Sequence, residues 1–230
     1  GDEGERSFTF LVDPSADQFL TAEGLPEFAD DILHFCSLAL VTTTCRETLV
    51  RAIGSIKQRG GLLSFDINLR EQMWPDAQEM SDTVRHFARQ ADILKLSQEE
   101  LYWLTGTTQH DKALAILGGY PSRLKVVTCG SDGSVVLWQD QIVEMSAYKV
   151  DSLDTTGAGD AFMAGLLASL AQGNALTDLS QLKQALSQAS ACGALATTAK
   201  GALAALPDEN VLKAFRASVA ELAVNLRPAR

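Results

Sequence analysis

The sequence lacks the features of several common classes of protein. Its formal net charge is -10, so it has no surplus of positive charge with which to hold a nucleic-acid backbone or an anionic membrane. No apolar run is long enough to span a bilayer, and no apolar leader follows a basic start. We therefore expect no nucleic-acid partner, no membrane association and a cytoplasmic location.

Cysteine and histidine are scarce and scattered. The four cysteines form no CxxC pair, which predicts reduced thiols at Cys36, Cys45, Cys129 and Cys192. The three histidines lack the spacing of zinc ligands, so we expect no zinc site. No GxGxxG motif follows an early strand, which argues against an oxidoreductase that uses a dinucleotide.

What the sequence does contain is an alternation of short apolar runs with helical patterns. The runs predict strands at Phe8–Val12, Ile32–Leu40, Leu62–Ile67, Ile93–Leu96 and Lys125–Thr128. Helical spacing lies between them, at Cys45–Arg59, Ser81–Ala91, Gln98–Leu104 and Asp111–Leu117. Continuous apolar runs suit strands that are buried on both faces. We therefore predict an α/β fold with a doubly wound, mostly parallel sheet.

The second half of the sequence predicts a hairpin and a helical end. Ser134–Trp138 and Ile142–Ala147 flank a short polar turn, which indicates an antiparallel hairpin at the sheet edge. Helices are predicted at Gly159–Ala171, Leu179–Thr198 and Asp208–Leu222. With no internal repeat and no low-complexity linker, residues 1–230 are predicted to form a single domain.

The segment with the clearest chemistry runs from Asp154 to Phe162, DTTGAGDAF, directly before an apolar helix. Glycines let the backbone turn tightly and approach a ligand, and N–H groups at a helix start attract anions. Asp160 would lie beside such an anion hole, where a carboxylate can accept the proton of an attacking hydroxyl. The residues alone leave a second interpretation open, a glycine-rich helix entry in which Asp160 only favours the helix dipole.

Several ordered segments resemble the PfkB carbohydrate kinases, the ribokinase-like family. Residues 154–166 are similar to the family's C-terminal signature. The other segments resemble those of bacterial fructokinases in order and spacing, and aminoimidazole riboside kinases are also similar. These segments are GERSFTF at 4–10, SFDINLR at 64–70, KLSQEEL at 95–101, VTCGSDG at 127–133, and CGALA with TAKGA at 192–202. Ile67 stands where the family has proline.

The resemblance implies a catalytic site. Asp160 would be the base, and Gly157, Ala158 and Gly159 would bind the transferring phosphoryl group through their backbone N–H groups. Glu100 would help to place Mg²⁺ through water, although it could equally be a solvated carboxylate in a helix's first turn. The resemblance implies ATP contacts at Ser97, Thr128, Gly130, Gly133 and Ser190. Thr128, Gly130 and Gly133 could instead form a plain turn between a strand and a hairpin.

The resemblance also implies a monovalent cation site, and we expect potassium to activate the protein. The positions that match its ligands are Asp154, Thr156, Ala196, Gly201 and Ala205. Ala205 stands where relatives have a serine ligand, and it lacks the hydroxyl.

Sugar contacts are implied at Arg6, Asn68 and Arg70. Arg6 could instead be an exposed strand arginine, and Asn68 and Arg70 could be loop residues that order Trp74. Residues 1–13 would form the lid-strand region, which could support a homodimer or only cover the sugar. The family's N-terminal strand and helix, with its sugar-binding Asp and Gly-Gly…Asn motif, has no match here. We therefore expect an N-terminally incomplete domain.

The expected reaction is ATP-dependent phosphorylation of the primary hydroxyl of a furanose sugar. The sequence favours D-fructose, giving fructose 6-phosphate, because the segments around Arg6, Asn68 and Ser97 resemble fructokinases. Aminoimidazole riboside kinase and ribokinase are the enzymatic alternatives. A non-catalytic sugar-binding protein on the same scaffold is the alternative of a different class, and the intact Asp160 argues against it.

Overall fold

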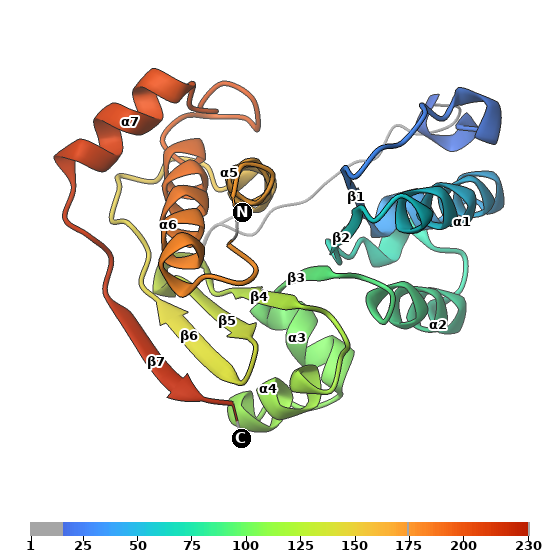
Figure 1. The fold of residues 1–230 in the computed structure, drawn as a ribbon, viewed down its shortest axis with the longest axis horizontal. Helices are drawn as coiled ribbons and strands as arrows, with labels where there is room; N and C mark the ends of the chain where they lie inside the picture. The colour runs from blue at the N-terminus through green and yellow to red at the C-terminus, as the bar shows by residue number, and fades with distance from the viewer. Residues whose placement is uncertain (1–15, 174, 230) are drawn as a thin grey trace.

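The computed structural model describes residues 16–173 and 175–229, and within them it forms one mixed sheet with helices on both faces (Figure 1). The strands follow the order of the chain, β1-β2-β3-β4-β5-β6-β7. The first four are parallel to one another, and β5, β6 and β7 add antiparallel. The predicted α/β class and mostly parallel sheet are confirmed. Three predictions concern residues that are not described: the sugar contact at Arg6, the strand at 8–12 and the lid-strand region at 1–13.

The parallel half of the sheet is buried as its apolar runs predict. Its strands are β1 (Ile32–Cys36), β2 (Leu62–Asp66), β3 (Ile93–Ser97) and β4 (Leu124–Thr128). In β2, β3 and β4 four of five residues are buried. Parallel strands end at one common edge of a sheet, so Asp66, Ser97 and Thr128 lie near one another at its carboxyl edge.

Four helices cover one face. They are α1 (Thr43–Gln58), α2 (Ala77–Ala88), α3 (Gln98–Thr105) and α4 (His110–Gly118). Their apolar sides pack on Phe65, Leu94 and Val127 in the larger of the two main cores. Side chains close three of these helices at the N-terminus: Thr42 caps α1, Asp76 caps α2 and Ser97 caps α3.

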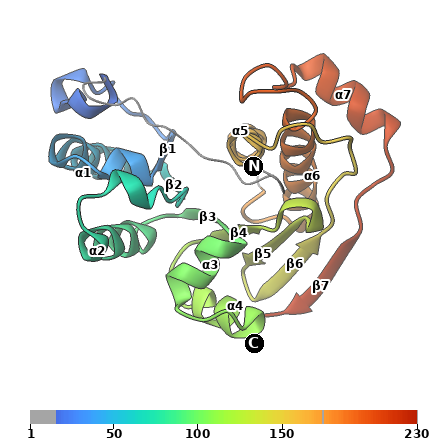
Figure 2. The same cartoon turned by 180° about the vertical axis from the view of Figure 1, so that it is seen from behind.

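Two helices, α5 (Ala158–Leu170) and α6 (Leu179–Ala196), cover the other face (Figure 2). They pack on Ile93, Leu124 and Val126 in the second main core. The two helices approach closely because Gly165 has no side chain. A Cβ at this position would lie 2.8 Å from Cys192 Sγ. Helix α7 (Glu209–Ser218) lies against α6.

The antiparallel half contains the predicted hairpin and a strand that the sequence did not reveal. The hairpin strands are β5 (Ser134–Trp138) and β6 (Gln141–Met145). The predicted helix at 208–222 ends at Ser218, and β7 (Val224–Pro228) then pairs with β6. The prediction that the hairpin forms the sheet edge is therefore wrong, because β7 lies outside it.

Two boundaries differ from prediction for physical reasons. The strand predicted to run from Ile32 to Leu40 ends at Cys36, and Ser37–Leu40 form a 3-10 turn held by a hydrogen bond from Ser37 Oγ to Asn68 O. Helix α2 begins at Ala77 rather than Ser81 because Asp76 caps it. The remaining 3-10 turns are Ala16–Phe19, Ala22–Gly24, Glu71–Met73 and Gly130–Asp132.

The four cysteines are free thiols, as expected. In the part of the chain that is described, no helix is both long enough and apolar enough to cross a membrane.

Candidate active site

At the start of helix α5, the backbone N–H of Ala158 donates to the carbonyl oxygen of Thr155 at 3.2 Å. Gly157 adopts a left-handed conformation with φ of 79°, and no side chain caps the helix. A Cβ on Gly157 would lie 3.0 Å from the Cβ of Ala202, so both the conformation and the packing require glycine. First-turn N–H groups have no partner within a helix, so this helix end is suited to an anion.

Asp160 stands in the first turn of α5, as the sequence predicts. Its side chain is exposed, and it makes no hydrogen bond to another described residue. Its charge reaches the carboxyl edge of the neighbouring strands. Burial lowers the pKa of His34, and the negative charge of Asp160 acts in the opposite direction. Burial also raises the pKa of the Cys36 thiol, and the charge of Asp160 adds to this increase. Asp160 is therefore a carboxylate with free acceptor oxygens beside the open helix end.

A cavity of about 570 Å³ opens beside this helix start. It brings together the predicted anion-hole residues Ala158 and Gly159 and most of the residues predicted to contact ATP, namely Thr128, Gly130, Gly133 and Ser190. Gly133 has φ of 103°, and a Cβ there would lie 2.0 Å from the carbonyl oxygen of Met145. The turn after β4 therefore needs glycine to shape the cavity wall.

Sequence reasoning missed the far wall of this cavity, which includes Tyr148, Lys149 and Val150. Tyr148 is buried, its hydroxyl lies 2.9 Å from Ser187 Oγ, and its ring meets the edge of Phe215 from α7. The segment carries no motif, so only the fold reveals it.

Ser97 and Glu100 lie outside that cavity and close the start of α3. Ser97 Oγ accepts from Glu100 N at 3.2 Å, and Glu100 Oε2 accepts from Ser97 N at 2.7 Å, which is a capping box. The second oxygen, Oε1, accepts from Leu69 N at 2.6 Å. Both carboxylate oxygens thus hold backbone N–H groups. Each keeps a further lone pair for a water molecule.

The predicted cation ligands converge in part. Asp154 Oδ1 accepts from the Thr156 hydroxyl at 2.6 Å, and Asp154 Oδ2 accepts from Gly201 N at 2.9 Å. The carbonyl oxygen of Thr197, which sequence reasoning did not single out, accepts from Asp154 N at 3.1 Å. A carboxylate, a hydroxyl and nearby carbonyls form a hard oxygen set that suits a monovalent cation. Ala196 is buried at the end of α6, and Ala205 offers no side-chain oxygen.

Two of the predicted sugar contacts, Asn68 and Arg70, lie on the loop after β2, outside the cavity beside α5. Asn68 has a positive φ of 38°, and its carbonyl accepts from Ser37 Oγ. Arg70 Nη1 donates to the carbonyl of Leu69 at 2.8 Å. Because Glu100 holds Leu69 N, this loop is fixed to the start of α3.

A buried ion pair at the carboxyl edge was also missed. Lys95 Nζ lies 2.8 Å from Asp66 Oδ2, and the two residues are 5% and 2% exposed. Asp66 Oδ1 is buried without a hydrogen-bond partner. Burial raises the pKa of Asp66 to about 6, against the opposing attraction of Lys95. The sequence did contain a sign of this pair, namely a lysine inside a continuous apolar strand. Such a lysine indicates a partner of opposite charge, because buried charges are rare unless they are paired.

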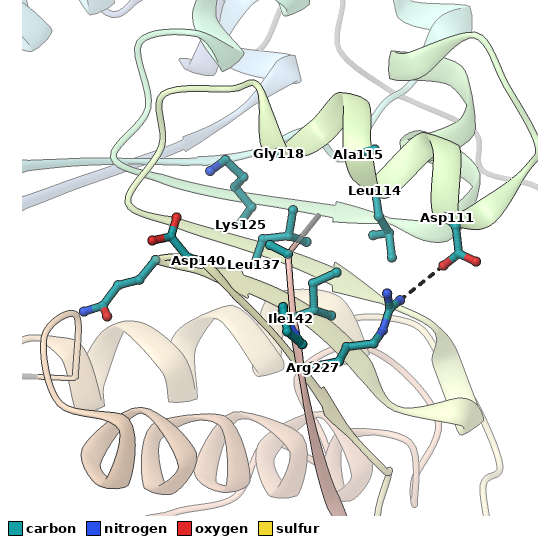
Figure 3. Close-up of a pocket in the computed structure, with 12 residues that line it drawn as sticks. Asp111, Leu114, Ala115, Gly118, Lys125, Leu137, Asp140, Ile142 and Arg227 are labelled. Carbon is teal, nitrogen blue, oxygen red and sulfur yellow. Dashed lines mark hydrogen bonds and ion pairs between the residues drawn. The ribbon is translucent and has the colours of Figure 1, made fainter.

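A second cavity, of about 680 Å³, lies between α4 and the antiparallel strands (Figure 3). None of the predicted site residues lines it. Arg227 of β7 pairs there with Asp111 of α4 at 3.2 Å, drawn as a dashed line in Figure 3, and with Glu144 of β6 at 2.8 Å. Lys125 also faces this cavity, and its ammonium donates to the carbonyl of Ser122. No cluster of three metal-ligating side chains occurs among the described residues.

Comparison with known proteins shows the family of this chain. The family model described as pfkB family carbohydrate kinase matches residues 1–209. A fructokinase of Salmonella typhimurium is 45% identical over 208 residues, which are 90% of this chain and 68% of that protein. An aminoimidazole riboside kinase of Salmonella typhimurium is 37% identical over 217 residues, covering 94% of this chain and 68% of that protein.

A solved structure is similar to nearly the whole chain. It is a double mutant of the fructokinase of Vibrio cholerae O395 in a form that holds fructose, ADP and a potassium ion. The TM-score is 0.87 at 43% sequence identity, and the match covers 92% of this chain and 69% of that one. The chain thus spans about two thirds of the length of these relatives.

Proposed function

This chain belongs to the pfkB family of carbohydrate kinases, and from that premise we propose that it carries the nucleotide site and catalytic base of an ATP-dependent fructokinase. The reaction transfers the γ-phosphoryl group of ATP to the primary hydroxyl of D-fructose. The products are fructose 6-phosphate, ADP and a proton.

The proposal is supported chiefly by an uncapped helix start that borders a cavity of about 570 Å³, with a free carboxylate in the first turn of the same helix. Gly157 opens the start of α5, and Asp160 follows in its first turn. Among the helices that cover the two faces of the sheet, this is one of only two without a side-chain cap. An open helix end beside a cavity is suited to an anionic ligand.

The proposed step assigns one role to each group. Asp160 accepts the proton of the sugar hydroxyl as its oxygen attacks the γ-phosphorus. The N–H groups of Gly157, Ala158 and Gly159 stabilise the charge on the transferring phosphoryl group. The bond between the γ-phosphorus and its bridging oxygen breaks, and ADP leaves with the electron pair. Positioning and charge stabilisation supply most of the rate in such transfers.

Two cations are proposed from the donor groups present. Mg²⁺ neutralises charge on the phosphates, and Glu100 would hold its water ligands with the lone pairs that the capping box leaves. Potassium is supported by the oxygen set around Asp154 and by the ion in the similar fructokinase structure. That site would hold the loop before α5 in place, because Ala202 lies directly against Gly157.

The sugar is proposed from similarity. Fructokinases match at 45% identity, and the riboside kinase matches at 37%. Asn68 and Arg70 remain proposed sugar contacts, because they lie on a fixed loop at the carboxyl edge of the sheet. Arg6 and a homodimer through residues 1–13 remain expectations from the sequence.

The test is ADP release by the protein that carries this chain, with ATP, Mg²⁺ and potassium, and with fructose, ribose or aminoimidazole riboside offered separately. We expect fructose-dependent release. Asp160→Asn should lower kcat between about 100-fold and 10,000-fold, because it removes the general base. Asp82→Asn, an exposed aspartate on α2, is the matched control and should leave kcat unchanged.

Other outcomes separate the alternatives. A preference for the riboside would keep the mechanism and replace the sugar. A folded protein that binds ATP but releases no ADP with any of the sugars would indicate a non-catalytic binding protein instead.

A further inference from the structure

The floor of the cavity in Figure 3 is a row of four residues on neighbouring strands. Lys125 of β4 lies opposite Leu137 of β5. Leu137 lies opposite Ile142 of β6, which in turn lies opposite Arg227 of β7. All four residues line the cavity, so they point to one face of the sheet. Figure 3 shows the charged groups of Lys125 and Arg227 at opposite ends of the row, with the two apolar side chains between them.

The two cations of this row differ in how their charges are balanced. Arg227 forms ion pairs with Asp111 at 3.2 Å and with Glu144 at 2.8 Å. Lys125 is 9% exposed, and among the described residues its ammonium makes one hydrogen bond, to Ser122 O at 2.9 Å, and no ion pair. Burial lowers the pKa of Lys125. A lysine ammonium has three donors, so a buried cation with open donors faces the cavity.

The rest of the cavity suits an apolar ligand. Leu114, Ala115 and Gly118 of α4 form the wall opposite the sheet. The volume of about 680 Å³ falls within the range of about 300–1,000 Å³ that is usual for small-molecule sites. Asp140 also lines the cavity, but it is exposed in the hairpin turn, so water weakens its effect on an anion. No residue of this cavity lines the cavity beside α5.

We propose that this cavity binds a small organic acid, whose carboxylate accepts from the Lys125 ammonium and whose apolar body lies over Leu137 and Ile142. A buried ammonium without a counter-charge is costly, and a carboxylate supplies both the charge and the acceptors that it lacks. The apolar body adds the burial of its own surface. This site is separate from the proposed kinase reaction and does not depend on it.

Phenylacetate is the probe, because it joins a carboxylate to an apolar ring. We would titrate it by calorimetry into the protein that carries this chain. Phenylacetamide keeps the ring without the charge, and acetate keeps the charge without the ring. We expect phenylacetate to bind about 10- to 100-fold more tightly than either, as for a hydrogen bond to a charged group combined with apolar burial. Failure of phenylacetate to bind, or equal binding of phenylacetate and phenylacetamide, would overturn the proposal.

Two lysine variants show whether the probe binds at this site. Lys125→Met keeps an unbranched side chain and removes the charge, so it should weaken phenylacetate about 10-fold or more and leave the weaker binding of phenylacetamide unchanged. Lys112→Met is the matched control, because Lys112 is exposed on α4 and does not line the cavity. It should leave both affinities unchanged. Equal weakening of phenylacetate by the two variants would mean that only the overall charge matters, and the proposal would fail.

Stability and a cavity-filling variant complete the test. Lys125→Met removes a buried charge that has no ion-pair partner, so it should melt at or above the temperature of the wild type. A lower melting temperature with unchanged affinity for phenylacetate would make Lys125 a structural residue and end the proposal. Ala115→Phe fills the cavity from α4 and leaves Lys125 in place. It should weaken phenylacetate and phenylacetamide alike. Unchanged binding of phenylacetate in this variant would place the probe elsewhere and overturn the proposal, even if Lys125→Met failed to fold.

Discussion

Helices α3 and α5 begin near the same edge of the sheet, and both carry an acidic residue in the first turn, yet the two helix starts are built in opposite ways. At α3, Glu100 and Ser97 satisfy each other's backbone N–H groups, and Glu100 also binds Leu69 N. At α5, Gly157 offers no side chain, and Asp160 makes no hydrogen bond to another described residue. The first arrangement stabilises the fold, and the second leaves donors and an acceptor free for a ligand.

The difference shows that residue type alone does not assign a role. A capped helix start gains about 0.5–2 kcal/mol from its cap, and an uncapped one gives up that stability. At α5 the uncapped start is closely packed. Gly157 is left-handed and lies against Ala202, and Gly159 lies above the Lys95 ammonium, so a side chain at either glycine would meet a neighbour. An uncapped start at which the packing requires glycine is suited to a functional site.

The largest expected effect comes from filling the open helix start. Gly157→Ala forces a side chain into a left-handed residue and against Ala202. We expect kcat to fall by about 100-fold or more, as for loss of an oxyanion-hole donor. The left-handed conformation adds a stability loss of about 1–2 kcal/mol. Steady-state kinetics and thermal melting measure both.

Gly54→Ala is the control for this change. Gly54 lies inside α1, and a Cβ there would meet nothing within 4 Å. We expect unchanged kcat and a gain of roughly 0.5–1 kcal/mol in the free energy of unfolding, since alanine favours the helix. If Gly157→Ala kept full activity while melting lower, the helix start would be structural like that of α3.

The next effect concerns the loops that hold this start open. Asp154 ties Thr156 and Gly201 together beside Gly157, and potassium is proposed to bind the same oxygens. Replacing potassium with tetramethylammonium should lower the fructose-dependent rate by up to about 100-fold, because a small misplacement of catalytic groups is costly. Ionic strength is held constant. An unchanged rate after the replacement would show that potassium has no role in the mechanism and that Asp154 only fixes the loops.

A smaller effect tests whether Glu100 does more than close α3. Ser97→Ala should cost about 1 kcal/mol in the free energy of unfolding, because the cap is lost. Glu100→Gln should cost a similar amount, about 1–2 kcal/mol, since it weakens hydrogen bonds to a charged group. Chemical denaturation measures both. If Glu100 also holds the waters of Mg²⁺, only Glu100→Gln should raise the Mg²⁺ concentration needed for half-maximal rate. Equal Mg²⁺ dependence in the two variants would leave Glu100 as a purely structural residue.

The sequence predicted those parts of the molecule that local patterns control. Buried apolar runs predicted strands β2, β3 and β4, and the glycine-rich segment predicted the open start of α5 with Asp160 in its first turn. Strand β7 was missed because none of its five residues is buried, and because its pairing with β6 depends on a partner about eighty residues away. Tertiary pairing of this kind leaves little trace in local composition.

The sequence likewise predicted the site residues that belong to local motifs, and it missed those that depend on tertiary contacts. Residues that lie on glycine turns, such as Gly130 and Gly133, were found by motif and do line the cavity. Tyr148 and the pair of Lys95 with Asp66 were missed. Their significance depends on what packs beside them: Phe215 from α7 in one case and Gly159 from α5 in the other. A charged residue inside an apolar strand indicates that a partner of opposite charge is present, but it does not identify that partner.

The last expected effect bears on stability alone, and it is the pH dependence that Asp66 confers. Burial raises the pKa of Asp66 to about 6, above its value in the unfolded chain of about 3.9. The folded protein therefore binds more protons than the unfolded chain between these two values. The contribution of Asp66 is fully present below pH 3.9 or so, and it is lost as the pH rises through about 6. Denaturant unfolding of the wild type and Asp66→Asn at several pH values isolates this contribution.

Asp66→Asn cannot titrate, so the difference in unfolding free energy between it and the wild type should change between about pH 3.9 and 6 and be constant below and above that window. Bound nucleotide sharpens the comparison with α3. If a phosphate binds at the start of α5, a non-hydrolysable analogue of ATP should raise the midpoint of this change, because the phosphate adds negative charge near the Asp66 carboxylate and competes for its ammonium. A midpoint that does not move with the analogue would mean that the pair beneath α5 is as closed to ligands as the start of α3.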